Sequence, residues 1–226
     1  MSEADDRPDD AALAEAGRLL FARESVFLRG AVKLDQLPPM EGPEIAFAGR
    51  SNVGKSSLVN ALAGRRMLAK VSNTPGRTQE LNFFRIGGVL TLVDMPGYGF
   101  AQAPEAKVKA WTRLALGYLE GRTSLARVFL LIDARHGLKK TDVPVLDRLD
   151  RAAVSYQVVL TKADQLKPAE AEARHAEVAA ALARRPAAYP EVLLTSGRTG
   201  AGVPDLRAAI ARLLAERGAL SPGCAN

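Results

Sequence analysis

The stretch Gly49-Arg50-Ser51-Asn52-Val53-Gly54-Lys55-Ser56 decides the fold, because it matches the pattern G-x-x-x-x-G-K-[ST]. It lies between an apolar run at 44–48 that predicts a strand and a segment at 55–63 that predicts a helix. Glycines let backbone N–H groups surround a phosphate, and the start of the helix adds its positive dipole end. We therefore predict a nucleoside triphosphate site in which Lys55 reaches the β- and γ-phosphates and the Ser56 hydroxyl binds Mg²⁺.

Strands and helices alternate after this loop, which is typical of an α/β fold. Gly87-Gly88 predicts a tight hairpin between the second and third strands. The expected domain has three layers, with a six-stranded, mostly parallel sheet and one antiparallel edge strand, and it binds ligands at the carboxyl ends of its strands. Further strands are predicted at 81–86, 89–94, 127–133, 156–161 and 191–195, and further helices at 105–120, 141–152, 168–184 and 203–217.

The two ends of the chain differ from its middle. Residues 1–10 hold five acids against one base and offer little apolar surface, so we expect a disordered acidic tail. Apolar residues at helical spacing follow, and residues 11–42 are expected to form a helix and a linker that pack on the main domain, 43–217. Residues 218–226 are expected to form a flexible tail.

Composition and charge narrow the class of protein. Of the 226 residues, 47% are apolar and 25% are charged, values typical of a soluble domain. No uncharged apolar run reaches the roughly 18 residues that span a membrane, and the single cysteine, Cys224, has no partner for a disulfide. We expect a cytoplasmic monomer with no membrane contact. The net charge of +6 favours an anionic partner larger than a nucleotide, with RNA first, or else serves only solubility.

Two polar segments are placed to sense the γ-phosphate and the metal ion. Asp94-Met95-Pro96-Gly97 follows an apolar strand, so that Asp94 would hold Mg²⁺ while the N–H of Gly97 meets the γ-phosphate. A polar stretch at 72–79 lies between the first helix and the second strand and is expected to be the first switch. Within it, Thr78 is the preferred second hydroxyl on Mg²⁺, with Thr74 as the rival.

Thr161-Lys162-Ala163-Asp164 indicates which base is bound. It is similar to the N-K-x-D element of GTPases, with threonine in place of asparagine. Its carboxylate accepts two hydrogen bonds from guanine that adenine cannot donate, and an unpaired buried carboxylate is costly. Lys162 is expected to lie along the base, and backbone N–H groups at Leu194-Thr195-Ser196-Gly197 to contact the guanine oxygen. An ATP-hydrolysing enzyme or small-molecule kinase using the same loop is the competing interpretation.

Together these elements resemble the EngB family, also called YihA or YsxC, of bacterial ribosome-biogenesis GTPases, in the TrmE-Era-EngA-EngB-Septin-like superfamily. The resemblance rests on GRSNVGKSSLVN (49–60), TPGRTQELNFF (74–84), DMPGYGFA (94–101) and TKAD (161–164). It implies a P-loop G domain that binds GTP or GDP, a role in assembling the large ribosomal subunit with its rRNA, and a requirement for normal cell division and septation. The implied nucleotide contacts are Gly49, Arg50, Ser51, Asn52, Val53, Gly54, Lys55, Ser56, Gly76, Arg77, Thr78, Gln79, Glu80, Asp94, Met95, Pro96, Gly97, Thr161, Lys162, Ala163, Asp164, Leu194, Thr195 and Ser196. The implied magnesium hydroxyls are those of Ser56 and Thr78.

Two residues bear on hydrolysis. Tyr98 stands directly after the D-x-x-G element, where many GTPases have a water-orienting glutamine, and this predicts slow intrinsic turnover. Asn52 lies where potassium-activated GTPases hold K⁺ beside the phosphates, and we hypothesise that K⁺ supplies the charge of an arginine finger. Lys55, Thr78 and Asn52 are the expected catalytic residues. The alternative function is a nucleotide-gated RNA-binding module with negligible turnover.

Overall fold

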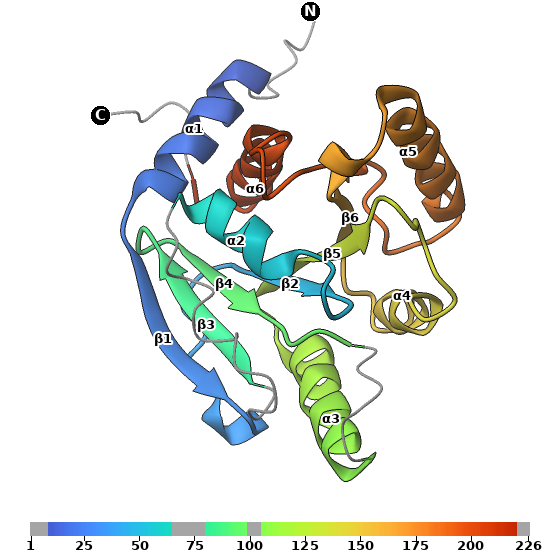
Figure 1. Cartoon of the computed structure of the whole chain (residues 1–226). Coiled ribbons are helices and arrows are strands. Elements are labelled where there is room, and N and C mark those ends of the chain that lie inside the picture. The colour runs from blue at the N-terminus through green and yellow to red at the C-terminus, as the bar shows by residue number, and fades with distance from the viewer. Residues whose placement is uncertain (1–8, 65–79, 99–104, 221–226) are drawn as a thin grey trace, which may run out of the picture.

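The computed structural model describes residues 9–64, 80–98 and 105–220. One seven-stranded sheet lies at the centre, and helices cover both of its faces, so the domain has three layers (Figure 1). In their order across the sheet, the strands are β1 (Ser25–Ala31), β3 (Leu81–Ile86), β4 (Leu90–Asp94), β2 (Glu44–Gly49), β5 (Leu125–Asp133), β6 (Tyr156–Thr161) and β7 (Leu193–Leu194). One face is covered by α1 (Asp10–Ala22), α2 (Lys55–Ala63) and α6 (Val203–Glu216), and the other by α3 (Glu105–Gly121), α4 (Val143–Arg151) and α5 (Pro168–Leu182).

The sheet differs from the prediction in two ways. It has seven strands rather than six. The antiparallel strand is β3, which lies between β1 and β4 and not at an edge. The additional strand, β1, has no alternating pattern, because Val26, Phe27 and Leu28 follow one another and each is 43–45% exposed. A bulge between Phe27 and Arg29 also shifts the register of its pairing with β3.

The other predicted elements agree with the structure to within two residues at each end. At the N-terminus, α1 begins at Asp10, inside the expected tail 1–10, because the Asp9 carboxylate accepts a hydrogen bond from the Ala11 N–H at 3.3 Å and caps the helix. Residues 1–8 and 221–226 of the two expected tails lie outside the described residues. Among the helices of the described part, none is long and apolar enough to cross a membrane.

The central strand β2 shows why the sheet is buried on both sides. Ile45 and Phe47 point into the core beneath α1, α2 and α6, whereas Ala46 and Ala48 point into the core on the other face. Successive side chains of a strand face opposite ways, so a strand covered by helices on both faces needs apolar residues at every position. This double burial fixes the carboxyl end of β2, where the phosphate loop begins.

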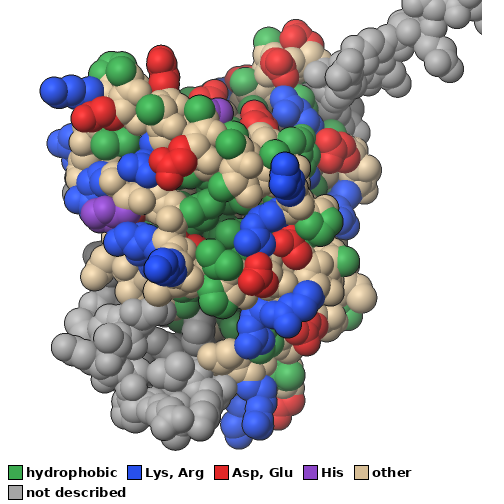
Figure 2. Space-filling model, turned by 90° about the vertical axis from the view of Figure 1, so that its right-hand side faces the viewer, with side chains coloured by type: hydrophobic (Ala, Val, Ile, Leu, Met, Phe, Trp, Pro, Cys, Tyr) green, Lys and Arg blue, Asp and Glu red, His purple; other side chains and the backbone are tan. Residues whose placement is uncertain are grey.

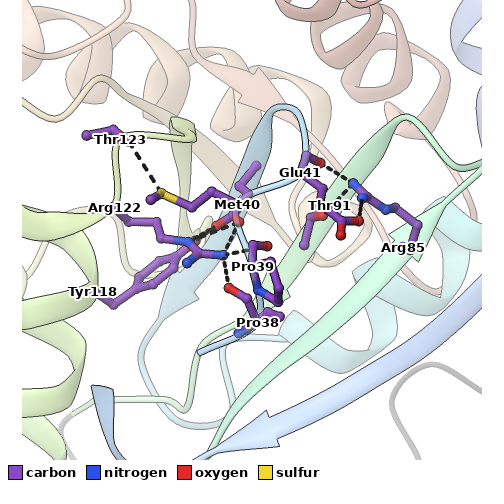
Figure 3. Close-up of polar contacts among 10 residues, drawn as sticks. Pro38, Pro39, Met40, Glu41, Arg85, Thr91, Tyr118, Arg122 and Thr123 are labelled. Atoms are coloured by element: carbon purple, nitrogen blue, oxygen red, sulfur yellow. Dashed lines mark hydrogen bonds and ion pairs between the residues drawn. The ribbon is translucent and has the colours of Figure 1, made fainter. Parts of the chain in front are cut away.

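A buried polar cluster ties the linker before β2 to the end of α3 (Figure 3). Glu44, the first residue of β2, is 1% exposed and accepts a hydrogen bond from Arg122 Nη2 at 2.6 Å and from the Tyr118 hydroxyl at 3.0 Å. Arg122 also donates to the carbonyl oxygen of Pro38 at 2.8 Å. The linker therefore has a fixed path across the amino end of the sheet, opposite the phosphate loop.

Candidate nucleotide-binding site

The predicted phosphate loop forms a tight turn between β2 and α2. Gly54 has a φ of 100° and Asn52 a φ of 63°, and the left-handed region is one that glycine and asparagine tolerate best. A β-carbon on Gly49 would lie 2.9 Å from the carbonyl oxygen of Leu131 on β5, so the close approach of these strands requires glycine. The loop leads directly into α2 at Lys55, where the N–H groups of a helix N-terminus attract anions.

Lys55 and Asp94 come together beside this loop. The Lys55 ammonium donates a hydrogen bond to the carboxylate of Asp94, and the two form an ion pair. Asp94 ends β4, the parallel neighbour of β2, and stands opposite Phe47 in the pairing of the two strands. Asp94 is buried, with only 5% of its surface exposed.

The oxygen atoms near the loop are suited to magnesium. Ser56, the second residue of α2, offers a hydroxyl and Asp94 offers a carboxylate, both of the oxygen type that Mg²⁺ prefers. Among the residues that the structure describes, no group of three or more His, Cys, Asp or Glu could hold a metal ion alone. The predicted residues of the first switch, Thr74, Gly76, Arg77, Thr78 and Gln79, lie outside the described residues.

The segment after Asp94 pairs with the phosphate loop. The Tyr98 N–H donates to the Gly49 carbonyl and the Ser51 N–H donates to the Tyr98 carbonyl, both at 3.1 Å. A β-carbon on Gly97 would lie 2.8 Å from the Ser51 nitrogen, so glycine allows this close contact. The D-x-x-G segment and the loop are therefore in direct backbone contact.

The Tyr98 side chain points to a buried carboxylate. Its hydroxyl donates to Asp142 at 2.9 Å, and Asp142 is completely buried just before α4. Burial, and next the charge of Asp142, raise the pKa of Tyr98 well above its ordinary value, so the phenol stays a hydrogen-bond donor. Because this hydroxyl already has a partner, Tyr98 does not serve as a substitute for a water-orienting glutamine in this arrangement.

The T-K-x-D element contacts the phosphate loop from the other side. The Thr161 hydroxyl donates to the Val53 carbonyl at 2.6 Å, which gives the threonine a structural role at the position of the usual asparagine. Lys162 Nζ donates to the Asn52 carbonyl at 2.7 Å and to Asp133 at 2.9 Å. The lysine thus connects the end of β6 to the phosphate loop.

Asp164 has the chemistry of a guanine acceptor. Its carboxylate accepts hydrogen bonds from the Ser196 hydroxyl at 2.6 Å and from Arg198 Nε at 2.9 Å. The bond from Ser196, followed by that from Arg198 with its charge, holds the pKa of Asp164 below its ordinary value. The carboxylate is therefore ionised at neutral pH and accepts hydrogen bonds only, which suits the N1–H and N2–H₂ of guanine.

Three further residues of the site are not predicted from the sequence: Asp133, Asp142 and Arg198. Asp133 ends β5 and orients Lys162; although burial raises its pKa, hydrogen bonds from Arg135 and Lys162 outweigh this and hold the pKa well below its ordinary value. The position of Asp133 at the carboxyl end of a strand is a signal that could have identified it. The pairing of Arg198 with Asp164, and of Asp142 with Tyr98, has no sequence signal that we recognise.

The other predicted contacts are distributed around the same edge of the sheet. Met95 is buried, and its N–H donates to the Phe47 carbonyl at 3.0 Å. The Ala163 N–H donates to the Thr195 carbonyl at 3.1 Å, which joins the base element to the segment after β7. Glu80 precedes β3, and its carboxylate lies against Gly30 of β1. Pro96 and Leu194 provide backbone at this edge, and Leu194 packs partly into the core below α5.

This combination of fold and site defines a P-loop GTPase domain. A family model described as "50S ribosome-binding GTPase" matches residues 44–162, from β2 to the base element. A protein of Bradyrhizobium diazoefficiens named "Probable GTP-binding protein EngB" is 62% identical over 210 residues, which cover 92% of this chain and 97% of that protein. A protein of the same name from Brucella melitensis is 59% identical over 220 residues, with 93% and 91% covered. The chain belongs to the EngB family of GTP-binding proteins.

Solved structures agree on the fold. The crystal structure of a probable GTP-binding protein engB covers 77% of this chain and 100% of its own, with a TM-score of 0.61 and 23% identity. The structure of Era with MgGDPNP and nucleotides 1506–1542 of 16S ribosomal RNA covers 77% of this chain and 57% of its own, with a TM-score of 0.58 and 22% identity. At these identities the likeness shows the α/β P-loop GTPase fold alone.

Proposed function

We propose that this protein hydrolyses GTP with Mg²⁺ and acts as a switch in assembly of the large ribosomal subunit, with normal cell division and septation depending on it. The observation that carries the proposal is the convergence of the phosphate loop, Asp94 and Asp164 at one edge of the sheet. The description of the family model supports the ribosomal part, and the sequence resemblance to the EngB family supports the part in division.

In this proposal each side chain acts on a defined part of GTP. Lys55 exchanges Asp94 for the β- and γ-phosphates, while Ser56 and Asp94, with Thr78 of the first switch, hold Mg²⁺. When bound, Mg²⁺ neutralises the charge that develops on the phosphates. The Asp164 carboxylate, oriented by Ser196, accepts from guanine, and its pairing with Arg198 is given up or rearranged as the base enters.

The structure supports a slow intrinsic turnover. The Tyr98 hydroxyl is bonded to Asp142, so no side chain directly after the D-x-x-G element is free to orient water. The same observation favours the alternative, a nucleotide-gated RNA-binding module with negligible turnover. Asn52 is an exposed residue of the phosphate loop, and we propose that it helps K⁺ to stabilise the transition state.

Phosphate release from GTP, measured in potassium and in sodium buffers with Mg²⁺, tests these roles. We expect faster GTP turnover in potassium than in sodium. In Asn52→Ala this difference between the two salts is expected to disappear. Equal rates in the two salts would remove K⁺ from the mechanism, and no turnover in either would leave the RNA-binding module as the better description. Asp164→Asn should move the preference from GTP toward XTP, and unchanged GTP selectivity would contradict the role of Asp164.

Co-sedimentation with purified large ribosomal subunits tests the ribosomal part. We expect more protein in the pellet with a non-hydrolysable GTP analogue than with GDP or without nucleotide. Equal absence of binding in all three states would remove the ribosome from the proposal and leave the GTPase part intact.

A further inference from the structure

The loop that joins β5 to α4 exposes cations and buries its acids. Arg135, Lys139 and Lys140 are exposed, whereas Asp133 and Asp142 at its two ends are 4% and 0% exposed. We refer to residues 135–140 as the basic loop. Figure 2 shows the molecule from the side of α4 and α5, where Lys and Arg side chains are interspersed with Asp and Glu around a group of hydrophobic side chains.

The basic loop has a fixed shape. The His136 and Gly137 N–H groups both donate to the Asp133 carbonyl at 3.0 Å, and just before the loop the Ala134 N–H donates to the Thr161 carbonyl at 2.9 Å. Within the described part of the chain, Lys139 and Lys140 have no ion-pair partner, and Arg135 pairs with Asp133 while its side chain stays 40% exposed. A loop that is already ordered loses little conformational entropy when it binds a ligand.

One buried carboxylate connects this loop to the nucleotide site. Asp142 Oδ2 accepts a hydrogen bond from the Lys139 N–H at 2.8 Å. Its other oxygen, Oδ1, accepts from the Tyr98 hydroxyl at 2.9 Å and lies 3.5 Å from Arg50 Nε of the phosphate loop. A movement of the segment after β4 therefore changes the hydrogen bonding of the group that holds the basic loop.

We propose that the basic loop is a docking surface for the phosphate backbone of RNA, and that Asp142 makes its geometry depend on the bound nucleotide. The proposal rests on the proposed function, since it names the surface by which a GTP switch would contact rRNA. RNA fits better than a protein partner, because residues 135–140 carry exposed Lys and Arg with no acid among them, and the large exposed apolar side chain that follows is a single one, Val143 at the start of α4. A protein interface would have an apolar centre.

The double variant Lys139→Gln/Lys140→Gln tests the surface. Its control is Lys33→Gln/Arg184→Gln, which removes two exposed charges elsewhere. Affinity for purified large ribosomal subunits and for a short labelled single-stranded RNA is measured against salt concentration, with a GTP analogue bound. We expect the slope of log affinity against log salt to fall by about 1.5 in the test variant and much less in the control.

An unchanged slope for both ligands would overturn the proposal, even if the affinity fell, since that result indicates a protein contact. A second outcome separates the two proposals. If the double variant lowers the salt slope for RNA but the wild type does not bind subunits, the basic loop remains an RNA-binding surface and the ribosomal part of the proposed function is rejected.

Tyr98→Phe tests the connection, because it removes only the hydroxyl bonded to Asp142. The matched control is Tyr118→Phe, which removes a buried hydroxyl bonded to Glu44 at the opposite end of β2. We expect the ratio of RNA affinities in the GTP-analogue and GDP states to approach 1 in Tyr98→Phe, with nucleotide affinity retained and the control unchanged. A wild-type ratio in Tyr98→Phe would refute the role of Asp142 as a positioning residue.

Discussion

Replacing Arg122 with methionine should strongly destabilise the domain. In the structure Arg122 Nε lies 3.0 Å from both Glu44 oxygens, Nη2 lies 2.6 Å from one of them and 2.8 Å from the Pro38 carbonyl. The variant would leave Glu44, 1% exposed, with the Tyr118 hydroxyl as its remaining partner in the described part of the chain. Removing one member of a buried ion pair costs about 3–5 kcal/mol, because the other charge stays buried without compensation.

Urea unfolding followed by circular dichroism measures this loss. For a chain of this size, the expected loss in free energy of unfolding corresponds to a fall in melting temperature of about 10 °C. The double variant Arg122→Met/Glu44→Met removes both charges. Its loss in free energy of unfolding should be smaller, by at least about 1.5 kcal/mol, than the sum of the losses in the two single variants. Arg85→Met is the control, since its partner Glu41 is 68% exposed and such pairs contribute about 1 kcal/mol or less.

Two results would refute this reasoning. One is a loss below about 1 kcal/mol for Arg122→Met, which is the range of a solvent-screened pair. The other is additivity of the two single changes to within about 0.5 kcal/mol, which would mean that Arg122 and Glu44 do not interact.

Three further predictions concern other parts of the domain. Thr161→Val should lower the free energy of unfolding by about 1–3 kcal/mol in urea titrations and weaken GTP binding, because the Val53 carbonyl loses its donor; equal binding would contradict this. The pKa of Asp133 is lowered in the folded state, so its contribution to stability is present above the unfolded pKa and is lost as the pH falls below about 4. Asp133→Asn should therefore show a shallower loss of melting temperature in acid than the wild type, and an identical acid profile would reject the assignment. Gly17→Ala should destabilise by about 1–3 kcal/mol in thermal unfolding, since its β-carbon would lie 2.5 Å from the Arg207 carbonyl on α6; a gain in melting temperature would show that α1 moves freely.

The sequence predicts the phosphate loop and the base element because their chemistry depends on residue type at fixed spacing. Glycine at 54 has a positive φ, and Asp164 is the carboxylate that we propose as the guanine acceptor, so both positions can be identified without coordinates. The central strands are also predictable, since burial on both faces demands continuous apolar residues.

What the sequence does not predict depends on pairings between distant segments. β1 is stabilised by its pairing with β3, about fifty residues later in the chain, and its own apolar residues are half exposed. In the sequence, nothing distinguishes Asp142 from any other residue before a helix, and only the fold brings the Tyr98 hydroxyl to it. Arg198 is likewise an ordinary cation of a loop in the sequence, and the pairing of β6 with β7 brings it beside Asp164.

The N-terminal strand also has a consequence for solubility. β3 is buried at every position except Arg85, and it carries Phe83 and Phe84. Without β1, the free N–H and C=O groups of this apolar strand would form the edge of the sheet, and such edges recruit strands from other molecules. β1 places a bulge between Phe27 and Arg29 at the sheet edge, which makes that edge a poorer template for further strands, although Val26, Phe27 and Leu28 leave some apolar surface exposed there. We therefore expect that loss of β1, a segment remote from the phosphate loop, would increase self-association through β3.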